Sequence, residues 1–226
     1  MDLVVVTSFI LPLIIAITLH EAAHGFMASK LGDNTAKMMG RVSFDPLKHI
    51  DPFGTLILPG ILLLTHSPAL FGWAKPVPVN FSNLRRPRRD TILVALAGPG
   101  MNILLAFVSA LLLHMDKVVT PEQAPWTFMN IYNSVMVNVV LAVFNLLPIL
   151  PLDGGRVLGA LLPRKLARTY AGTERYGLLI VVLFFMLPAF LRDAHLPTIN
   201  FGYYLIGLPA EMLSNAIFHL AGVGNS

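Results

Sequence analysis

Two histidines and a glutamate near the start of the chain have the spacing of a metal-dependent hydrolytic site. His20 and His24 are four residues apart, and Glu21 directly follows the first histidine. A helix would place both imidazoles on one face, about 6 Å apart along its axis, where both can reach one tetrahedral zinc ion. Glu21 could then take a proton from a metal-bound water, whose pKa falls to about 7. The alternative is a pair of core histidines with a chance acidic neighbour.

The apolar surroundings of this motif favour the metal site. The motif lies at the end of residues 3–19, a run that contains no charged side chain. Ionisable groups at membrane depth are costly and usually belong to a functional site. A hydrolytic zinc site needs a third protein ligand, which the chain must supply elsewhere.

The composition of the 226 residues predicts a membrane protein. Apolar residues make up 55% of the chain and charged residues only 12%, about half the share that is usual in soluble domains. We predict an all-α polytopic membrane protein, a bundle of about five or six transmembrane helices with short strand or re-entrant segments near the cytoplasmic face. The absence of cysteine excludes thiolate ligands and disulfides. A net charge of +4 does not favour nucleic acid as a partner, and the expected partner is the lipid bilayer.

Several apolar segments are candidates for the membrane-embedded elements. They are residues 3–27, 53–70, 91–115, 128–150, 176–191 and 201–220. Basic residues in 75–89 and 156–175 predict that these two loops lie in the cytoplasm. Residues 53–70 are interrupted by prolines, so they form either a re-entrant hairpin or a span whose chain returns in extended form. Residues 41–44 alternate in polarity and predict a short strand.

Asp153 is the candidate for the third metal ligand. Apart from Glu21, it is the only carboxylate at the edge of a long apolar segment beside a glycine turn. The segment before it crosses from outside to inside, so Asp153 should lie near the same face as the two histidines. Two imidazoles and one carboxylate leave one position open for water, and we expect about one zinc ion per chain. The alternative is an Asp-Gly turn that only ends the helix.

Residues 72–80 contain alternating prolines that make a one-sided strand conceivable. Pro76 and Pro78 remove amide donors along one edge, while Val77 and Val79 keep theirs on the other. Such an edge can pair with an extended peptide substrate. A stiff proline-rich connector explains the same residues equally well.

Three motifs together resemble the site-2 protease family of intramembrane zinc metalloproteases. They are His20–His24, the small-residue segment 97–102 and the segment 145–155, and they match in order and spacing. The resemblance covers roughly residues 3–156. Residues 72–80 are similar to a stretch of the short bacterial members, which lack a PDZ domain.

This resemblance implies a set of residue roles. His20, His24 and Asp153 would bind zinc. Glu21 would be the catalytic base, and Asn145 would hold the substrate carbonyl or the developing oxyanion. A structural alternative for Asn145 is that it caps backbone groups freed by Pro148.

The resemblance also implies a function and a location. The expected reaction is hydrolysis of peptide bonds in or near transmembrane segments of membrane protein substrates, as in regulated intramembrane proteolysis, at the inner membrane with the active site near the cytoplasmic face. Residues 1–156 would be the metalloprotease core and residues 157–226 accessory transmembrane helices. The alternative is a zinc-dependent binding or transport protein that uses the same ligands. Glu21 argues against it, because a binding site needs no base, and no pair of broken helices repeats in two halves.

Overall fold

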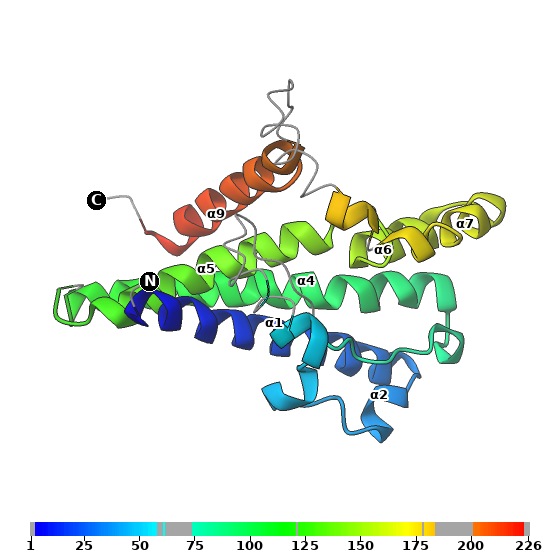
Figure 1. Ribbon diagram of the computed structural model, residues 1–226, viewed down its shortest axis with the longest axis horizontal. Coiled ribbons are helices and arrows are strands. Elements are labelled where there is room, and N and C mark those ends of the chain that lie inside the picture. Colours follow the sequence, from blue (N-terminus) through cyan, green and yellow to red (C-terminus); the bar gives the residue numbers. More distant parts are fainter. Residues whose placement is uncertain are drawn as a thin grey trace.

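Three long helices form the centre of the computed structural model, which describes residues 3–57, 61, 74–120, 122–177, 179–183 and 201–223. They are α1 (Leu3–Leu31), α4 (Pro87–Leu112) and α5 (Pro125–Asn145), and they pack side by side along the long axis (Figure 1). Within the described residues, Thr7–Leu31, Pro87–Asp116 and Pro125–Asn145 are long and apolar enough to cross a membrane.

Many of the side chains between the helices are small, while many large apolar ones point outward. Ala16 in α1, Ala106 and Ala110 in α4 and Ala142 in α5 are fully buried. Small residues let helix backbones approach closely, which is how helices associate in lipid. Large residues such as Phe9, Leu104, Leu111 and Val140 are exposed on the outer surface. This distribution fits a bundle whose surroundings are apolar.

Shorter helices surround this bundle. α9 (Leu208–Ala221) continues from the π-helical turn η6 (Tyr203–Gly207) and packs on α5 and α4 (Figure 1). α6 (Asp153–Leu161) and α7 (Arg164–Ala171) lie beyond the end of α5. The remaining elements are α2 (Thr35–Met38), η1 (Pro46–His49), η2 (Pro52–Ile57), η3 (Phe81–Asn83), η4 (Leu113–Lys117) and η5 (Glu174–Tyr176).

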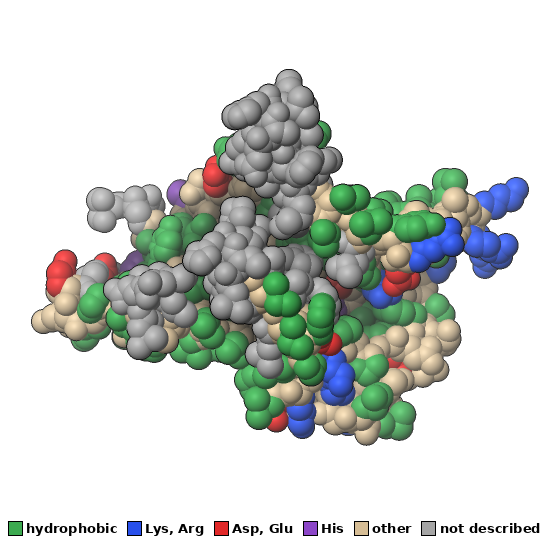
Figure 2. All heavy atoms as spheres, in the orientation of Figure 1, with side chains coloured by type: hydrophobic (Ala, Val, Ile, Leu, Met, Phe, Trp, Pro, Cys, Tyr) green, Lys and Arg blue, Asp and Glu red, His purple; other side chains and the backbone are tan. Residues whose placement is uncertain are grey.

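The two ends of the bundle differ in charge. Figure 2 shows Lys and Arg side chains at the end formed by α7, and Asp and Glu side chains at the opposite tip. The start of α4 lies at the α7 end, where Arg88 donates hydrogen bonds to the carbonyl oxygens of Ala160 (3.1 Å) and Leu162. The two basic loops predicted to share one side of the membrane are therefore neighbours.

The helical fold class is confirmed, and the predicted strand is wrong. No strand occurs among the described residues, and residues 42–44 form bends. This segment is joined to its neighbour by a side chain instead of a backbone ladder, because Arg41 Nη2 donates to the carbonyl oxygens of Lys75 (2.9 Å) and Pro76 (3.3 Å).

Three of the predicted spans correspond to α1, α4 and α5. Much of residues 53–70 and 176–191 lies outside the described residues, and the choice between a hairpin and a span for 53–70 falls there. The total of about five or six spans therefore stays a prediction.

Candidate metal centre

The centre is built where α1 crosses a glycine of α4. His20 and His24 lie on one face of α1 and are both buried. Gly98 of α4 lies directly against their rings: a Cβ atom there would be 2.5 Å from His20 Cε1 and closer still to His24 Nε2. Any side chain at this position would displace the imidazoles. The small-residue segment of α4 thus provides space for the two rings as well as close helix packing.

Asp153 reaches the histidines because the chain folds back sharply after α5. The helix ends at Asn145, earlier than predicted, and α6 begins at Asp153 itself. Gly155 packs on this turn so tightly that a Cβ atom would lie 2.6 Å from the carbonyl carbon of Ile149. The turn is also held from outside, where the Tyr170 hydroxyl of α7 donates to the carbonyl oxygen of Pro148 at 2.9 Å.

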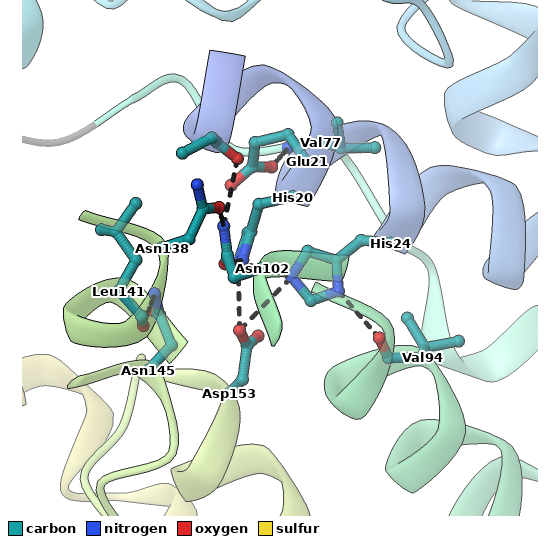
Figure 3. Close-up of polar contacts among 11 residues, drawn as sticks. His20, Glu21, His24, Val77, Val94, Asn102, Asn138, Leu141, Asn145 and Asp153 are labelled. Carbon is teal, nitrogen blue, oxygen red and sulfur yellow. Dashed lines mark hydrogen bonds and ion pairs between the residues drawn. The ribbon is translucent and has the colours of Figure 1, made fainter. Parts of the chain in front are cut away.

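The three side chains converge with the spacing of a tetrahedral metal site (Figure 3). The two Nε2 atoms of His20 and His24 are 3.0 Å apart, and each lies 3.3 Å from Asp153 Oδ2. Zinc–ligand distances of about 2.0–2.1 Å in a tetrahedron place neighbouring ligand atoms about 3.3 Å apart. The three atoms therefore match three corners of such a site.

The hydrogen bonds made by the Nδ1 atoms indicate whether the Nε2 atoms carry a proton or a lone pair. His24 Nδ1 lies 2.7 Å from the carbonyl oxygen of Val94, which can only accept, so Nδ1 carries the proton and Nε2 a lone pair. Asp153 Oδ2 is buried and accepts no hydrogen bond from any residue that the structure describes. Lone pairs that converge without a donor repel one another, whereas a cation between them would be coordinated. The donor set therefore fits a zinc ion.

Glu21 points to a different neighbour. Its Oε2 accepts a hydrogen bond of 2.7 Å from the backbone N–H of Val77, in segment 74–80, which has no regular secondary structure (Figure 3). Gly25 lets that segment lie close to α1, since a Cβ atom there would be 3.0 Å from Val77 Cγ1. The Val77 amide is thus already engaged. Its predicted pairing with a substrate requires this contact to open and stays a prediction.

Val79 and Asn145 are not drawn into the metal group. The Val79 side chain packs against the core cluster of Ala28, Leu84 and Val94. Asn145 Nδ2 donates to the carbonyl oxygen of Leu141 at 3.0 Å, one turn back in α5. The NH2 group of Asn145 therefore has a partner within its own helix, and the expected role of Asn145 toward the substrate stays a prediction.

Asn102 is a site residue that sequence reasoning did not single out. It is fully buried, and its Oδ1 lies 2.6 Å from His20 Nδ1. The available signal was its position four residues after Gly98, on the same face of the helix. An asparagine inside an apolar helix also needs a polar partner, and here that partner is a proposed ligand.

Comparisons with known proteins agree with this geometry. A family model described as "Peptidase family M50" matches residues 8–125 and 117–188. "Putative zinc metalloprotease YwhC" of Bacillus subtilis (strain 168) is 39% identical over 185 residues, which cover 79% of this chain and 80% of that protein. "Putative zinc metalloprotease Rip2" of Mycolicibacterium smegmatis (strain ATCC 700084 / mc(2)155) is 30% identical over 179 residues, 79% of this chain and 66% of that protein.

A further relative, "Putative zinc metalloprotease Rip2" of Mycobacterium tuberculosis (strain ATCC 25618 / H37Rv), is 29% identical over 177 residues, 77% of this chain and 65% of that protein. No solved structure matches the chain significantly. The family match extends over α1, α4, α5 and α6, the helices that build the metal centre. The chain therefore belongs to peptidase family M50, the site-2 protease family of membrane-embedded zinc metalloproteases.

Proposed function

We propose that this protein hydrolyses peptide bonds in or near the transmembrane segments of membrane proteins. The observation that carries the proposal is the buried triangle of His20 Nε2, His24 Nε2 and Asp153 Oδ2, with edges of 3.0, 3.3 and 3.3 Å, inside an apolar bundle. The names of the relatives support zinc as the bound metal. A fourth tetrahedral position would remain for water, as in hydrolytic zinc sites.

Glu21 is the proposed proton carrier. Zinc held by His20, His24 and Asp153 would supply a bound water of lowered pKa and polarise the scissile carbonyl. Glu21 follows the first ligand directly, and its carboxylate would accept the proton of that water and return it to the leaving amine. The contact with the Val77 N–H keeps the carboxylate in place before substrate arrives.

Substrate must be presented as extended chain. A transmembrane helix has its carbonyls bonded internally, so it has to unwind before attack. Opening of the Glu21–Val77 contact would free both the base and one backbone donor for the unwound segment. Asn145 would then exchange the Leu141 carbonyl for the substrate oxygen. Val79 would provide the second donor along the same edge.

Replacement of Glu21 tests this function against zinc binding or transport. Glu21→Gln keeps an oxygen that can accept from Val77 but removes the basic carboxylate. We expect it to retain zinc and to lose cleavage of a transmembrane peptide in detergent or vesicles, while Glu122→Gln, on the exposed turn before α5, cleaves normally. Near-normal cleavage by Glu21→Gln would contradict the proposed base. The transport alternative would be established by two results together: the wild type cleaves no substrate, and both the wild type and Glu21→Gln take up zinc into vesicles.

We also propose that residues 1–156 form the metalloprotease core and residues 157–226 the accessory helices. The protein would lie in the inner membrane with the metal centre near the cytoplasmic face. The clustering of basic side chains at the α7 end supports this orientation (Figure 2). Because the chain has no cysteine, single introduced thiols report topology directly. In intact cells Arg86→Cys and Arg164→Cys should be shielded from an impermeant thiol reagent and Gln123→Cys should be labelled. The reverse pattern would place the centre at the outer face.

A further inference from the structure

A line of buried amides runs from α5 through α4 to the first histidine. Asn102 Nδ2 donates to Asn138 Oδ1 at 2.8 Å and to the carbonyl oxygen of Ala16 at 3.3 Å. Asn138 Nδ2 in turn donates to the carbonyl oxygen of Ser134 at 2.9 Å. Asn102 is 0% exposed and Asn138 is 1% exposed, so water does not replace these bonds. The line joins α1, α4 and α5 at the level of the metal centre (Figure 3).

Two backbone carbonyls determine which way both amides face. The Ala16 carbonyl can only accept, so it requires the NH2 group of Asn102 on its side. The Ser134 carbonyl imposes the same condition on Asn138, which turns the Asn138 oxygen toward Asn102. Asn102 Oδ1 is left facing His20 Nδ1 at 2.6 Å. An amide oxygen cannot donate, so His20 Nδ1 must carry the proton and Nε2 the lone pair.

We propose that Asn102 is a positioning residue, which holds His20 in the Nδ1–H tautomer and in the ring orientation that binds the metal, and that Asn138 holds Asn102 in turn. The proposal rests on His20 being a metal ligand but not on the peptide-bond chemistry. His24 achieves the same result with the Val94 carbonyl, which no side-chain substitution removes. Replacing Asn102 therefore affects one ligand and leaves the other as an internal reference.

Zinc affinity tests the proposal without reference to activity. We expect Asn102→Leu to weaken zinc binding about 10- to 100-fold in competition with a chelator, as removal of outer partners of metal-bound histidines does. Asn138→Leu should cause a smaller loss, because the Asn102 oxygen can still reach His20. The matched control is Asn133→Leu, which removes an amide that links α5 to α1 (Asn133 Nδ2 to the carbonyl oxygen of Ser8, 3.1 Å) but touches no histidine and neither of the two buried amides. Wild-type affinity in Asn102→Leu, or an equal loss in Asn133→Leu, would overturn the proposal.

A spectroscopic measurement on the wild type decides the matter even if Asn102→Leu does not fold. Zinc-loaded protein with 15N-labelled histidine should show two downfield, slowly exchanging Nδ1–H protons, one facing Asn102 and one facing Val94. Asn102→Leu should lose the first and keep the second. A wild type with only one such proton would overturn the proposal. If these results are obtained and no substrate is cleaved, the proposed function fails while the role of Asn102 stands.

Discussion

Asp33, which follows α1, and Asp153, which begins α6, are two carboxylates with different hydrogen-bond surroundings. Asp33, just beyond α1, is fully buried and surrounded by donors. Its Oδ1 accepts from the Thr35 N–H (3.1 Å), the Thr35 hydroxyl and Asn83 Nδ2 (3.0 Å), and its Oδ2 accepts from the Asn80 N–H (2.7 Å). The protein itself satisfies this charge, so the group fastens segments together and needs no ligand.

Asp153 has the opposite surroundings. Among the described residues nothing donates a hydrogen bond to its Oδ2, which faces the two imidazole nitrogens of His20 and His24 at 3.3 Å. A buried carboxylate without hydrogen-bond donors destabilises the fold unless a cation binds to it. The comparison teaches that the hydrogen-bond donors around a buried acid, more than its depth, separate a structural group from a candidate metal ligand.

Exchanging each acid for its amide gives the largest expected contrast. Asp153→Asn should reduce zinc from about one ion per chain to a small fraction and abolish cleavage, because a ligand is lost. Asp33→Asn should keep its zinc, since no atom of Asp33 contacts the metal group. Metal analysis of both purified variants makes the measurement. Full zinc occupancy in Asp153→Asn would remove Asp153 from the site and end the comparison.

Replacement of Asn145 tests whether a side chain that is hydrogen-bonded within its own helix in the free protein can still act in the reaction. If it donates to the oxyanion, Asn145→Ala should lower the rate about 10²- to 10³-fold and retain zinc and thermal stability. Asn130→Ala is the matched control, because Asn130 Nδ2 donates to the carbonyl oxygen of Trp126 at 2.8 Å in the same pattern at the far end of α5. Normal turnover in Asn145→Ala with about 1 kcal/mol lost from stability would show a structural role, like that of Asp33.

The smallest effect concerns the stability that Asp33 provides. Burial opposes ionisation of Asp33, but hydrogen bonds from Thr35, Asn83 and Asn80 hold the pKa of this carboxyl below its usual 3.8. The stabilisation is therefore complete above about pH 4 and lost as the pH falls through the lower folded value. Asp33→Asn should be about 1–3 kcal/mol less stable at neutral pH.

Thermal unfolding in detergent across this range measures the difference between wild type and Asp33→Asn. The two curves should approach each other in acid, because the Asp33 carboxyl of the wild type is then protonated and carries no charge, like the amide of the variant. A constant difference at every pH would show that the charge of Asp33 contributes nothing.

The sequence predicted the parts of the site that depend on helix period and topology. His20 and His24 share a face because they are four residues apart, and Asp153 meets them because the helix before it runs toward the same end. The turn that carries Asp153 was recognisable from its prolines and glycines.

The parts that were missed depend on side-chain partners across helices. Nothing in the sequence pairs Asn102 with His20, or the amide of Val77 with Glu21, because these residues are 82 and 56 positions apart. The predicted strand at 41–44 failed for a similar reason: alternation in four residues is weak evidence, and the Arg41 side chain supplies the connection instead.

The contacts that residues 170–177 make with the turn before Asp153 limit how far this enzyme can be truncated from its C-terminal side. The recognisable motifs end by residue 156, yet Tyr170 bonds to Pro148, and Gly177 packs so closely on the same turn that a Cβ atom there would lie 2.6 Å from Pro151 Cδ. A truncated protein that keeps every motif would still lose the contacts that support the turn carrying Asp153, the proposed third ligand. Catalytic motifs and the minimal working fragment therefore have different boundaries, and a reduced version for engineering should extend at least through residue 177.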